Sequence, residues 1–258
     1  WEDYMGKRAY GAQSYWQERY LSRGRDTQRS DQTDEWLLDW EQLCPLFEAT
    51  LQTDASVLDL GCGTSTMCFH LADAFSGRIV ALDDAPAALS ELRRRQRGWV
   101  GTNAQRVELL IGDATKLGKV ISTGEFDAVV DKSTSDAMLC DEARGAWKVS
   151  QMYKQIASVM KLQFSACFIV SYRQPQDGLE WLSELVLPSM IEGSPSPHCH
   201  YSVDIHVVDA QRQAERHHPA PPPVVYEICR QQYRAMERPS KMRRTERASG
   251  VSFRYRMH

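Results

Sequence analysis

The sequence predicts an α/β fold: a seven-stranded, mostly parallel sheet with an antiparallel closing pair and a helical N-terminal extension. Two observations carry this prediction. From Ser56 onward, short apolar runs alternate with amphipathic segments, which is the pattern of parallel strands joined by crossover helices. Later, Tyr201–Val207 alternates between apolar and polar residues, as a strand with one buried face does.

Size and composition are those of one sizeable core with extensions. The chain has 258 residues, is 42% hydrophobic, and shows no linker-like segment at its centre. We expect a helical extension over residues 1–50, the main domain over residues 51–232 and a basic tail over residues 233–258. The formal net charge of -3 is too small to imply a nucleic-acid or membrane partner.

The extension is polar with interleaved aromatic residues, which favours helices packed on the main domain. The aromatic and apolar positions are Tyr10, Tyr15, Trp16, Tyr20, Trp36, Leu37, Leu38 and Trp40.

Five parallel strands are expected next along the chain, each a short apolar run. They cover Ser56–Leu60, Arg78–Leu82, Val107–Ile111, Phe126–Val130 and Ala166–Tyr172. The fifth contains Ala-Cys-Phe-Ile-Val, which suits a central strand buried on both faces.

Helices are expected between these strands. One covers Thr66–Ala74, and a second opens at Asp84-Ala85-Pro86, where Asp84 would be the N-cap, and runs to about Gln96. Apolar residues at helical spacing from Val149 to Met160 predict a third, with one face on the sheet.

The C-terminal third predicts two more strands, Tyr201–Val207 and Val225–Arg230, as the antiparallel pair. Gln211–Pro223 is rich in His and Pro, which favours an exposed loop. The tail from Arg234 is basic with few apolar residues, so disorder is expected; the alternative is a basic arm that contacts an acidic partner or RNA.

Several classes are disfavoured by composition. No apolar run approaches the roughly 18 residues of a membrane span, and Trp1-Glu2-Asp3-Tyr4 lacks a signal pattern, so a soluble, cytoplasmic protein is expected. The sequence does not begin with Met, which leaves open a preceding targeting segment. Seven scattered cysteines without a C-x-x-C pair favour reduced thiols over a disulfide scaffold or a zinc site.

Asp59, Gly61 and Gly63 stand where the first strand enters a glycine turn. Ligands of open α/β folds bind at the carboxyl ends of the strands, and glycine permits close approach because it has no Cβ. A dinucleotide fingerprint would continue with Gly or Ala at position 66, where this chain has Thr66. This departure weakens the prediction of a nicotinamide site.

Acidic residues then follow three successive strands. Asp59 and Asp83 end the first two, and Asp113 follows the third. S-adenosylmethionine has no pyrophosphate and needs acceptors for an ammonium group and two ribose hydroxyls. Asp83 lies near the spacing of about 20 residues at which an acid binds ribose, and Asp113 is placed to accept from the adenine amino group. The sequence therefore predicts S-adenosylmethionine as cofactor.

Three further segments carry a family resemblance: Tyr15–Tyr20, Phe126–Asp136 and Phe168–Pro175. With the glycine turn, they resemble the class I (seven-β-strand) methyltransferases, which have a Rossmann-like sheet. Within these, the chain is similar to the methyltransferase-like group that contains the elongation factor 1-alpha lysine methyltransferases and the citrate synthase lysine methyltransferase. The resemblance spans roughly Tyr15 to Arg230. Leu162–Ala166 departs from it, since the group usually has a proline and paired glycines there.

The resemblance implies a set of cofactor contacts, to which the glycine turn adds Asp59 and Gly63. The implied contacts are Trp16, Tyr20, Trp36, Gly61, Asp83, Asp84, Asp113, Ala114 and Lys132. The alternatives are core packing for the aromatic residues and a solvated loop position for Lys132. Asp131 and Asp136 either cap the loop or steer an incoming ammonium group. Arg173, in place of an expected glycine, would narrow the acceptor pocket or change its charge.

We therefore expect methylation of a protein lysine, with an elongation factor as the leading substrate by resemblance, and catalysis mostly by positioning, with no general base or metal ligand assigned. A small-molecule methyltransferase and a non-catalytic cofactor-binding scaffold are the alternatives, and a dehydrogenase is more distant.

Overall fold

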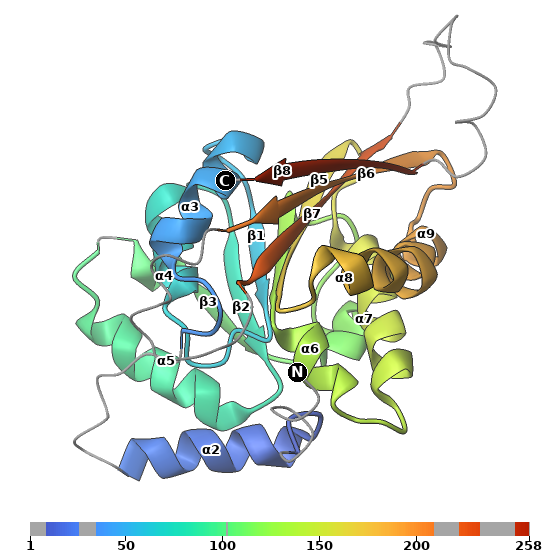
Figure 1. Cartoon of the computed structure of the whole chain (residues 1–258). Helices are drawn as coiled ribbons and strands as arrows, with labels where there is room; N and C mark the ends of the chain where they lie inside the picture. The colour runs from blue at the N-terminus through green and yellow to red at the C-terminus, as the bar shows by residue number, and fades with distance from the viewer. Residues whose placement is uncertain (1–8, 26–34, 102, 209–221, 233–250, 258) are drawn as a thin grey trace, which may run out of the picture.

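An eight-stranded sheet forms the centre of the molecule (Figure 1). The structure is a computed structural model, and it describes residues 9–25, 35–101, 103–208, 222–232 and 251–257. The strand order is β3-β2-β1-β4-β5-β7-β6-β8. The strands are β1 (Val57–Leu60), β2 (Ile79–Asp83), β3 (Glu108–Ile111), β4 (Ala128–Lys132), β5 (Phe164–Ser171), β6 (Cys199–Val207), β7 (Val224–Gln232) and β8 (Val251–Met257).

The mostly parallel sheet and its closing pair are confirmed. Strands β3, β2, β1, β4 and β5 are paired in parallel, and β7 runs antiparallel to both of its neighbours, β5 and β6. The order reverses at β1, between β2 and β4. This reversal is the switch point at which ligands bind in open α/β sheets.

All seven predicted strands are present, and an eighth joins them. Val251–Met257 forms β8, which pairs in parallel with β6, in a tail for which disorder was expected. The exposed side chain of Arg254 is tied to this sheet, because its Nε lies 2.9 Å from Asp204 Oδ1. The main domain therefore extends past its predicted end at residue 232. Residues 233–250 and most of the predicted His- and Pro-rich loop lie outside the described residues.

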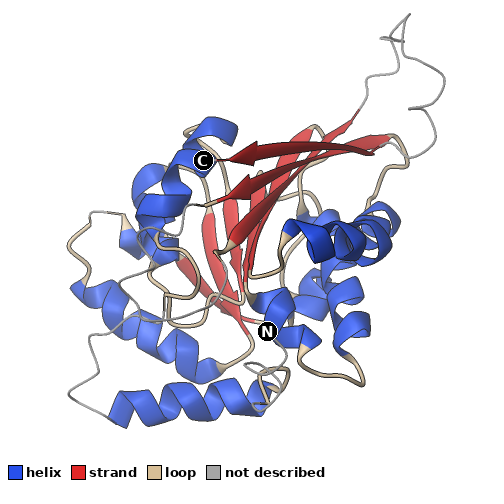
Figure 2. Cartoon of the chain, viewed as in Figure 1, coloured by secondary structure: helices blue, strands red, loops and turns tan. Residues whose placement is uncertain are grey.

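Helices cover both faces of the sheet (Figure 2). One face packs on α3 (Trp40–Thr50), α4 (Met67–Ala74) and α5 (Pro86–Gly98). The other packs on α7 (Gly145–Val159), the short helix Ala114–Lys119 and the helical run of α8 (Pro175–Trp181), Leu182–Val186 and α9 (Leu187–Gly193). Both cores are apolar, as a parallel sheet covered on two faces requires. The remaining described helices are α2 (Gln13–Arg25), Ala104–Arg106 and α6 (Thr134–Leu139).

The start of α5 differs from expectation in a way that matters for the site. Ala85 is the N-cap residue, and Pro86 begins the helix, so the prediction that Asp84 caps it is wrong. Ala85 donates its N–H to Asp83 Oδ1 at 2.8 Å. The helix thus begins without a side-chain cap, Asp83 accepts from the residue before it, and Asp84 lies beside the carboxyl ends of the strands.

Candidate functional site

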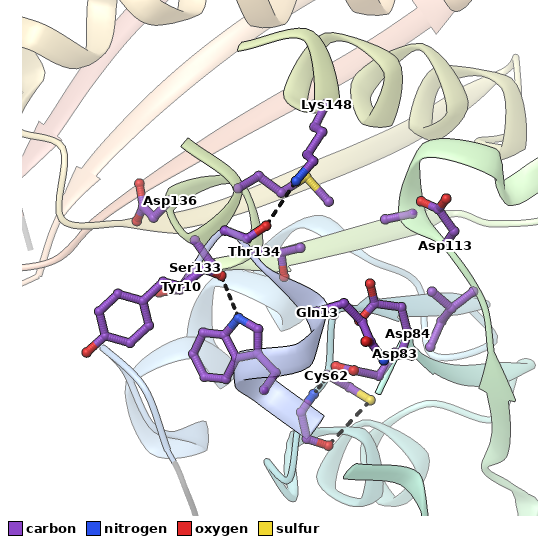
Figure 3. A pocket seen from close by; sticks show the side chains of 18 of the residues that line it. Tyr10, Gln13, Cys62, Asp83, Asp84, Asp113, Ser133, Thr134, Asp136 and Lys148 are labelled. Carbon is purple, nitrogen blue, oxygen red and sulfur yellow. Dashed lines mark hydrogen bonds between the residues drawn. The ribbon is translucent and has the colours of Figure 1, made fainter. Parts of the chain in front are cut away.

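A cavity of about 440 Å³ lies at the carboxyl ends of β1, β2 and β4, where the segments that follow four strands meet the N-terminal segment (Figure 3). Its volume is within the range of sites for drug-sized ligands. All eleven predicted cofactor contacts line it: Trp16, Tyr20, Trp36, Asp59, Gly61, Gly63, Asp83, Asp84, Asp113, Ala114 and Lys132. The structure thus gathers these residues in one place, while their contacts with a cofactor stay a prediction.

The two glycines of the turn are required by the protein itself. Gly61 and Gly63 have φ values of 66° and 55°, in the left-handed region that favours glycine. A Cβ on Gly61 would lie 2.1 Å from Thr134 Oγ1, and one on Gly63 would lie 2.6 Å from the Tyr20 hydroxyl. The turn is therefore packed between α6 and α2, and the glycines give room to these side chains.

The Asp83 carboxyl group connects the glycine turn to the start of α5 by hydrogen bonds. Its Oδ2 accepts the Gly63 N–H at 2.8 Å, and its Oδ1 accepts the Ala85 N–H at 2.8 Å. Burial raises the pKa of Asp83 above its ordinary value. Burial and the negative charges of Asp83 and Asp113 raise the pKa of Asp84 to about 6. Two adjacent carboxyl groups thus stand at this side of the cavity.

Both carboxylate oxygens of Asp113 accept hydrogen bonds from residues of the same loop. Thr115 donates to its Oδ1 from the backbone N–H at 2.9 Å and from Oγ1 at 2.6 Å, and Lys116 Nζ lies 2.6 Å from Oδ2. Partial burial raises the pKa of Asp113, but the hydrogen bonds from Lys116 and Thr115 outweigh this and hold it below its ordinary value. Ala114 follows Asp113 on the cavity wall.

Glu35 is a residue of the site that the sequence did not reveal. Its Oε2 accepts from Lys132 Nζ at 2.7 Å and from Ser65 Oγ at 2.8 Å, and its Oε1 accepts from the Thr66 N–H at 2.9 Å. Burial raises the pKa of Glu35, but Lys132 and these hydrogen bonds together lower it below its ordinary value. Lys132 is therefore a paired, nearly buried cation beneath the turn, and the alternative of a solvated loop lysine is wrong.

Aromatic side chains form the wall contributed by the N-terminal segment. Trp16 stacks on Tyr20 at 5.9 Å between ring centroids and meets Trp36 edge-on at 5.9 Å. The Trp16 indole donates to the Tyr10 carbonyl at 2.7 Å, so Tyr10 joins this wall although the sequence did not assign it to the site. The aromatic residues line the cavity as well as packing on one another.

Hydrogen bonds hold this segment over the cavity. Gln13 Nε2 donates to the Asp84 carbonyl at 3.0 Å, and Gln17 Oε1 accepts the Ala87 N–H at 3.0 Å. Lys148 of α7 donates to the Gly11 carbonyl at 2.9 Å. The N-terminal extension is thus part of the site.

Asp59 has an unmet polar group. Its side chain is 1% exposed, and its Oδ2 has no hydrogen-bond partner among the described residues. Burial raises the pKa of Asp59 to about 7, with smaller contributions from Glu35 and Asp83, against the opposing charge of Lys132. A buried carboxylate oxygen without a donor is destabilising unless a ligand supplies one.

Asp131 holds the loop that follows β4. Its Oδ1 accepts the N–H groups of Thr134 and Ser135 at 2.9 and 3.1 Å, and its Oδ2 accepts the Tyr153 hydroxyl at 2.6 Å. Of the two roles open for Asp131, capping the loop is the one that the structure supports. Asp136, on α6, lines the cavity.

Tyr153→Phe is expected to lower the free energy of unfolding by about 1–2 kcal/mol, because it leaves a fully buried Asp131 oxygen without its donor. Urea unfolding measures this change. Tyr201→Phe is the control of similar shape, since the Tyr201 hydroxyl donates to the neutral Met190 carbonyl at 3.2 Å and its loss should cost less. Equal losses would contradict a special role for the tyrosine–carboxylate pair.

The described part of the chain contains neither a candidate membrane-spanning helix nor a candidate metal site. No helix there is long and apolar enough to cross a bilayer. No group of three or more His, Cys, Asp or Glu side chains in those residues is arranged to hold a metal ion.

Solved structures match this fold at low sequence identity. The chain superimposes with a TM-score of 0.52 on the putative methyltransferase in complex with the Trm112 methyltransferase activator of Haloferax volcanii, at 14% identity, covering 84% of this chain and 98% of that one. The precorrin-6y C5,15-methyltransferase of Geobacter metallireducens gives 0.51 at 18% identity, covering 78% and 94%. At these identities the likeness concerns the fold alone.

Curated relatives share about half of the chain. The methyltransferase srdJ of Neurospora crassa is 33% identical over 51% of this chain and 54% of its own length. The citrate synthase-lysine N-methyltransferase CSKMT of Pongo abelii is 30% identical over 41% and 50%. The eEF1A lysine and N-terminal methyltransferase of Mus musculus is 26% identical over 59% and 20%. The chain thus spans about half, or less, of the length of these relatives.

The family is shown by a match to a family model, and this match includes the glycine turn and the parallel strands whose ends surround the cavity. The methyltransferase domain family matches residues 51–186, which is more than half of the chain. The chain therefore belongs to the methyltransferase domain family, whose cofactor is S-adenosylmethionine.

Proposed function

We propose that this enzyme methylates the side-chain amine of a lysine in a protein. The observation that carries the proposal is the charge of the cavity. Each lysine on its wall is already paired with a carboxylate: Lys116 with Asp113, Lys132 with Glu35 and Lys148 with Asp141. The carboxyl groups of Asp59, Asp83, Asp84 and Asp136 also line it, against one further cation among the described lining residues, Arg144, so carboxyl groups are in excess. An interior of this charge favours cationic ligands over anionic ones.

The residues present fit the cofactor. The unpartnered Oδ2 of Asp59 supplies an acceptor for the ammonium group, and Asp83 and Asp84 offer acceptors for ribose hydroxyls. We assign Asp113 and Ala114, which line the cavity, to the adenine, and the rings of the N-terminal wall to the cover of the site. These assignments are part of the proposal.

The bound cofactor supplies an electrophilic methyl group on a sulfonium. The chain's residues then have to align the acceptor with that group and exclude water. The wall of Tyr10, Trp16 and Trp36 provides the exclusion, because Trp36 meets the other two rings edge-on and these two pack on each other at a tilt. A lysine also has to lose a proton, since its ordinary pKa is about 10.4, and an aromatic, low-dielectric channel favours the neutral amine.

The relatives support a protein acceptor. Two of them are named for lysine methylation, one on eEF1A and one on citrate synthase. An elongation factor is the leading candidate substrate. The name of the third relative, srdJ, specifies no acceptor, so a small-molecule acceptor is the alternative that the experiment has to separate.

The experiment is incubation of the protein with radiolabelled S-adenosylmethionine and a cell lysate, followed by mass spectrometry of any labelled band. A labelled protein band with methylated lysine supports the proposal. Label only in small metabolites would overturn it in favour of a small-molecule methyltransferase. Tight cofactor binding without transfer to any fraction would instead support a non-catalytic scaffold. The Asp59→Asn variant controls for label carried by contaminating enzymes.

A further inference from the structure

A second buried carboxyl group of the cavity is left with an unmet oxygen. Asp136 is 3% exposed, lies in the first turn of α6 and lines the cavity. Figure 3 shows it on the side of the cavity away from Asp113, Asp83 and Asp84. It is therefore separated from the acids proposed for ribose and adenine.

The Asp136 carboxyl group is fixed at one oxygen and open at the other. Ser171 Oγ donates to its Oδ1 at 2.9 Å, and Arg173 Nε lies 3.7 Å from the same oxygen. The Tyr172 backbone N–H also approaches the carboxyl group and acts to lower its pKa, against the larger effect of burial. Its Oδ2 is buried and has no hydrogen-bond partner among the described residues. Arg173 is itself held, because its guanidinium lies 5.5 Å from the centroid of the Trp181 ring. The side chain is thus oriented by the end of β5, with one acceptor left over.

Several hydrogen bonds hold the turn that precedes α6, the helix that carries Asp136. Ser133 takes a left-handed conformation with φ of 66°, and Asp131 accepts the next two backbone N–H groups. Thr134 Oγ1 donates to the Leu60 carbonyl at 2.9 Å, which ties α6 to the glycine turn. The open oxygen is therefore held at a fixed place relative to the predicted cofactor site.

Charge at this place suits a cation. Burial raises the pKa of Asp136 to about 6, so the group is mainly ionised at neutral pH despite its environment. The nearest positive group, Arg173, does not come within hydrogen-bond distance of either oxygen in the described contacts. A ligand N–H would complete the coordination that the protein leaves unfinished.

We propose that Asp136 Oδ2 accepts a hydrogen bond from the amino group of the methyl acceptor and orients it in the cavity, with Ser171 and Arg173 as positioning residues behind it. This inference rests on the proposed lysine acceptor and deepens it. The lysine binds as an ammonium group and releases one proton to the solvent before the methyl group is transferred. A remaining N–H held by Asp136 then fixes the direction of the nitrogen, and the freed lone pair is available for the methyl group. The residue therefore selects amines over acceptors that bring no N–H.

The test measures amine and cofactor binding separately. The probes are N-acetyl-lysine amide and its uncharged analogue N-acetyl-norleucine amide, titrated into protein loaded with S-adenosylhomocysteine. Asp136→Asn is expected to weaken binding of the lysine probe by about tenfold to a hundredfold, as the loss of a charge-assisted hydrogen bond does. Binding of the norleucine probe and of S-adenosylmethionine should change by less than about twofold on the same scale.

Two further variants keep the test independent of folding. Asp136→Glu retains the charge and should keep more of the affinity for the lysine probe than Asp136→Asn. Asp177→Asn removes an exposed carboxylate from α8, outside the cavity wall, and should leave both affinities unchanged. A thermal melt of each variant shows that the fold is retained.

Three outcomes would overturn the inference. The first is a wild-type protein that does not prefer the lysine probe to the norleucine probe. The second is equal lysine-probe binding in wild type and Asp136→Asn. The third is a loss of S-adenosylmethionine affinity in Asp136→Asn with amine binding intact, which would assign Asp136 to the cofactor. Failure of the lysate experiment while the probes behave as expected would refute the protein substrate and leave the amine site standing.

Discussion

Asp59→Asn is expected to weaken S-adenosylmethionine binding by about a hundredfold, because it removes the charge of a buried acceptor. The Asp59 side chain is 1% exposed, and its Oδ2 has no partner among the described residues. The asparagine side chain has nearly the same shape, so the change tests charge rather than space. Isothermal titration calorimetry measures the affinity, and a loss below about threefold would contradict the assignment.

The same substitution should stabilise the protein without cofactor at pH 8. Burial raises the pKa of Asp59 from 3.8 to about 7, so the folded state holds a proton that the unfolded state releases near pH 4. Wild-type stability is then highest below about pH 4 with respect to this group and falls as the pH rises to about 7, by a total on the order of 4 kcal/mol. Asp59→Asn removes this loss, so it should gain the full amount of stability at pH 8 and less than half of it at pH 5.

Asp131→Asn is the matched control for stability. Asp131 is also fully buried and stands on the neighbouring strand, but its two oxygens accept from Thr134, Ser135 and Tyr153. Burial raises the pKa of Asp131 as well, but these hydrogen bonds oppose the rise, so Asp131→Asn should gain less stability at pH 8 than Asp59→Asn does. Urea unfolding at both pH values compares the two, and an equal gain would show that burial alone decides the effect.

The sequence predicted what depends on local pattern. Apolar runs located the strands of the parallel half, and Gly61 and Gly63 marked the turn at its switch point. The reason given for the glycines was incomplete, because Thr134 and Tyr20 take the space that a Cβ would need. These contacts join residues that are distant in the sequence, so no local pattern could announce them.

Glu35 and β8 were missed for different physical reasons. Glu35 lies 97 positions before Lys132 in the sequence, and a single acidic residue before an aromatic one carries no local signal. The residues of β8, by contrast, do alternate, since Val251, Phe253 and Tyr255 are separated by Ser252 and Arg254. The prediction missed this alternation because it rested on the basic composition of the whole tail, which is much longer than the strand.

The unusual segment at the start of β5 follows a turn that is bound by Arg230, a residue far along the chain. Leu162–Ala166 lacks the proline and paired glycines that the resemblance led us to expect. Here the carbonyls of the turn are bound from outside, because the fully buried Arg230 of β7 donates to the carbonyls of Ala157, Met160 and Lys161. The guanidinium thus closes the end of α7 and shapes the entry to β5.

Arg230→Met is expected to lower the free energy of unfolding by about 3–5 kcal/mol, because it keeps apolar volume but removes the buried donor of the Ala157 and Met160 carbonyls, while the Lys161 carbonyl keeps only Ser165 Oγ. Arg230→Lys should recover only part of this loss, since one ammonium group cannot reproduce the planar fork that reaches all three carbonyls. Urea unfolding followed by tryptophan fluorescence measures both variants.

Arg106 offers the matched comparison. Its guanidinium also closes a helix, donating to the carbonyls of Ala72, Ser76 and Gly77 at the end of α4, but the side chain is exposed. Water can replace it there, so Arg106→Met should cost about 1 kcal/mol or less. If the two arginines cost the same, burial of the carbonyls is not what makes Arg230 important. The expected large difference would instead show that one arginine, distant in the sequence, stabilises the turn between α7 and β5.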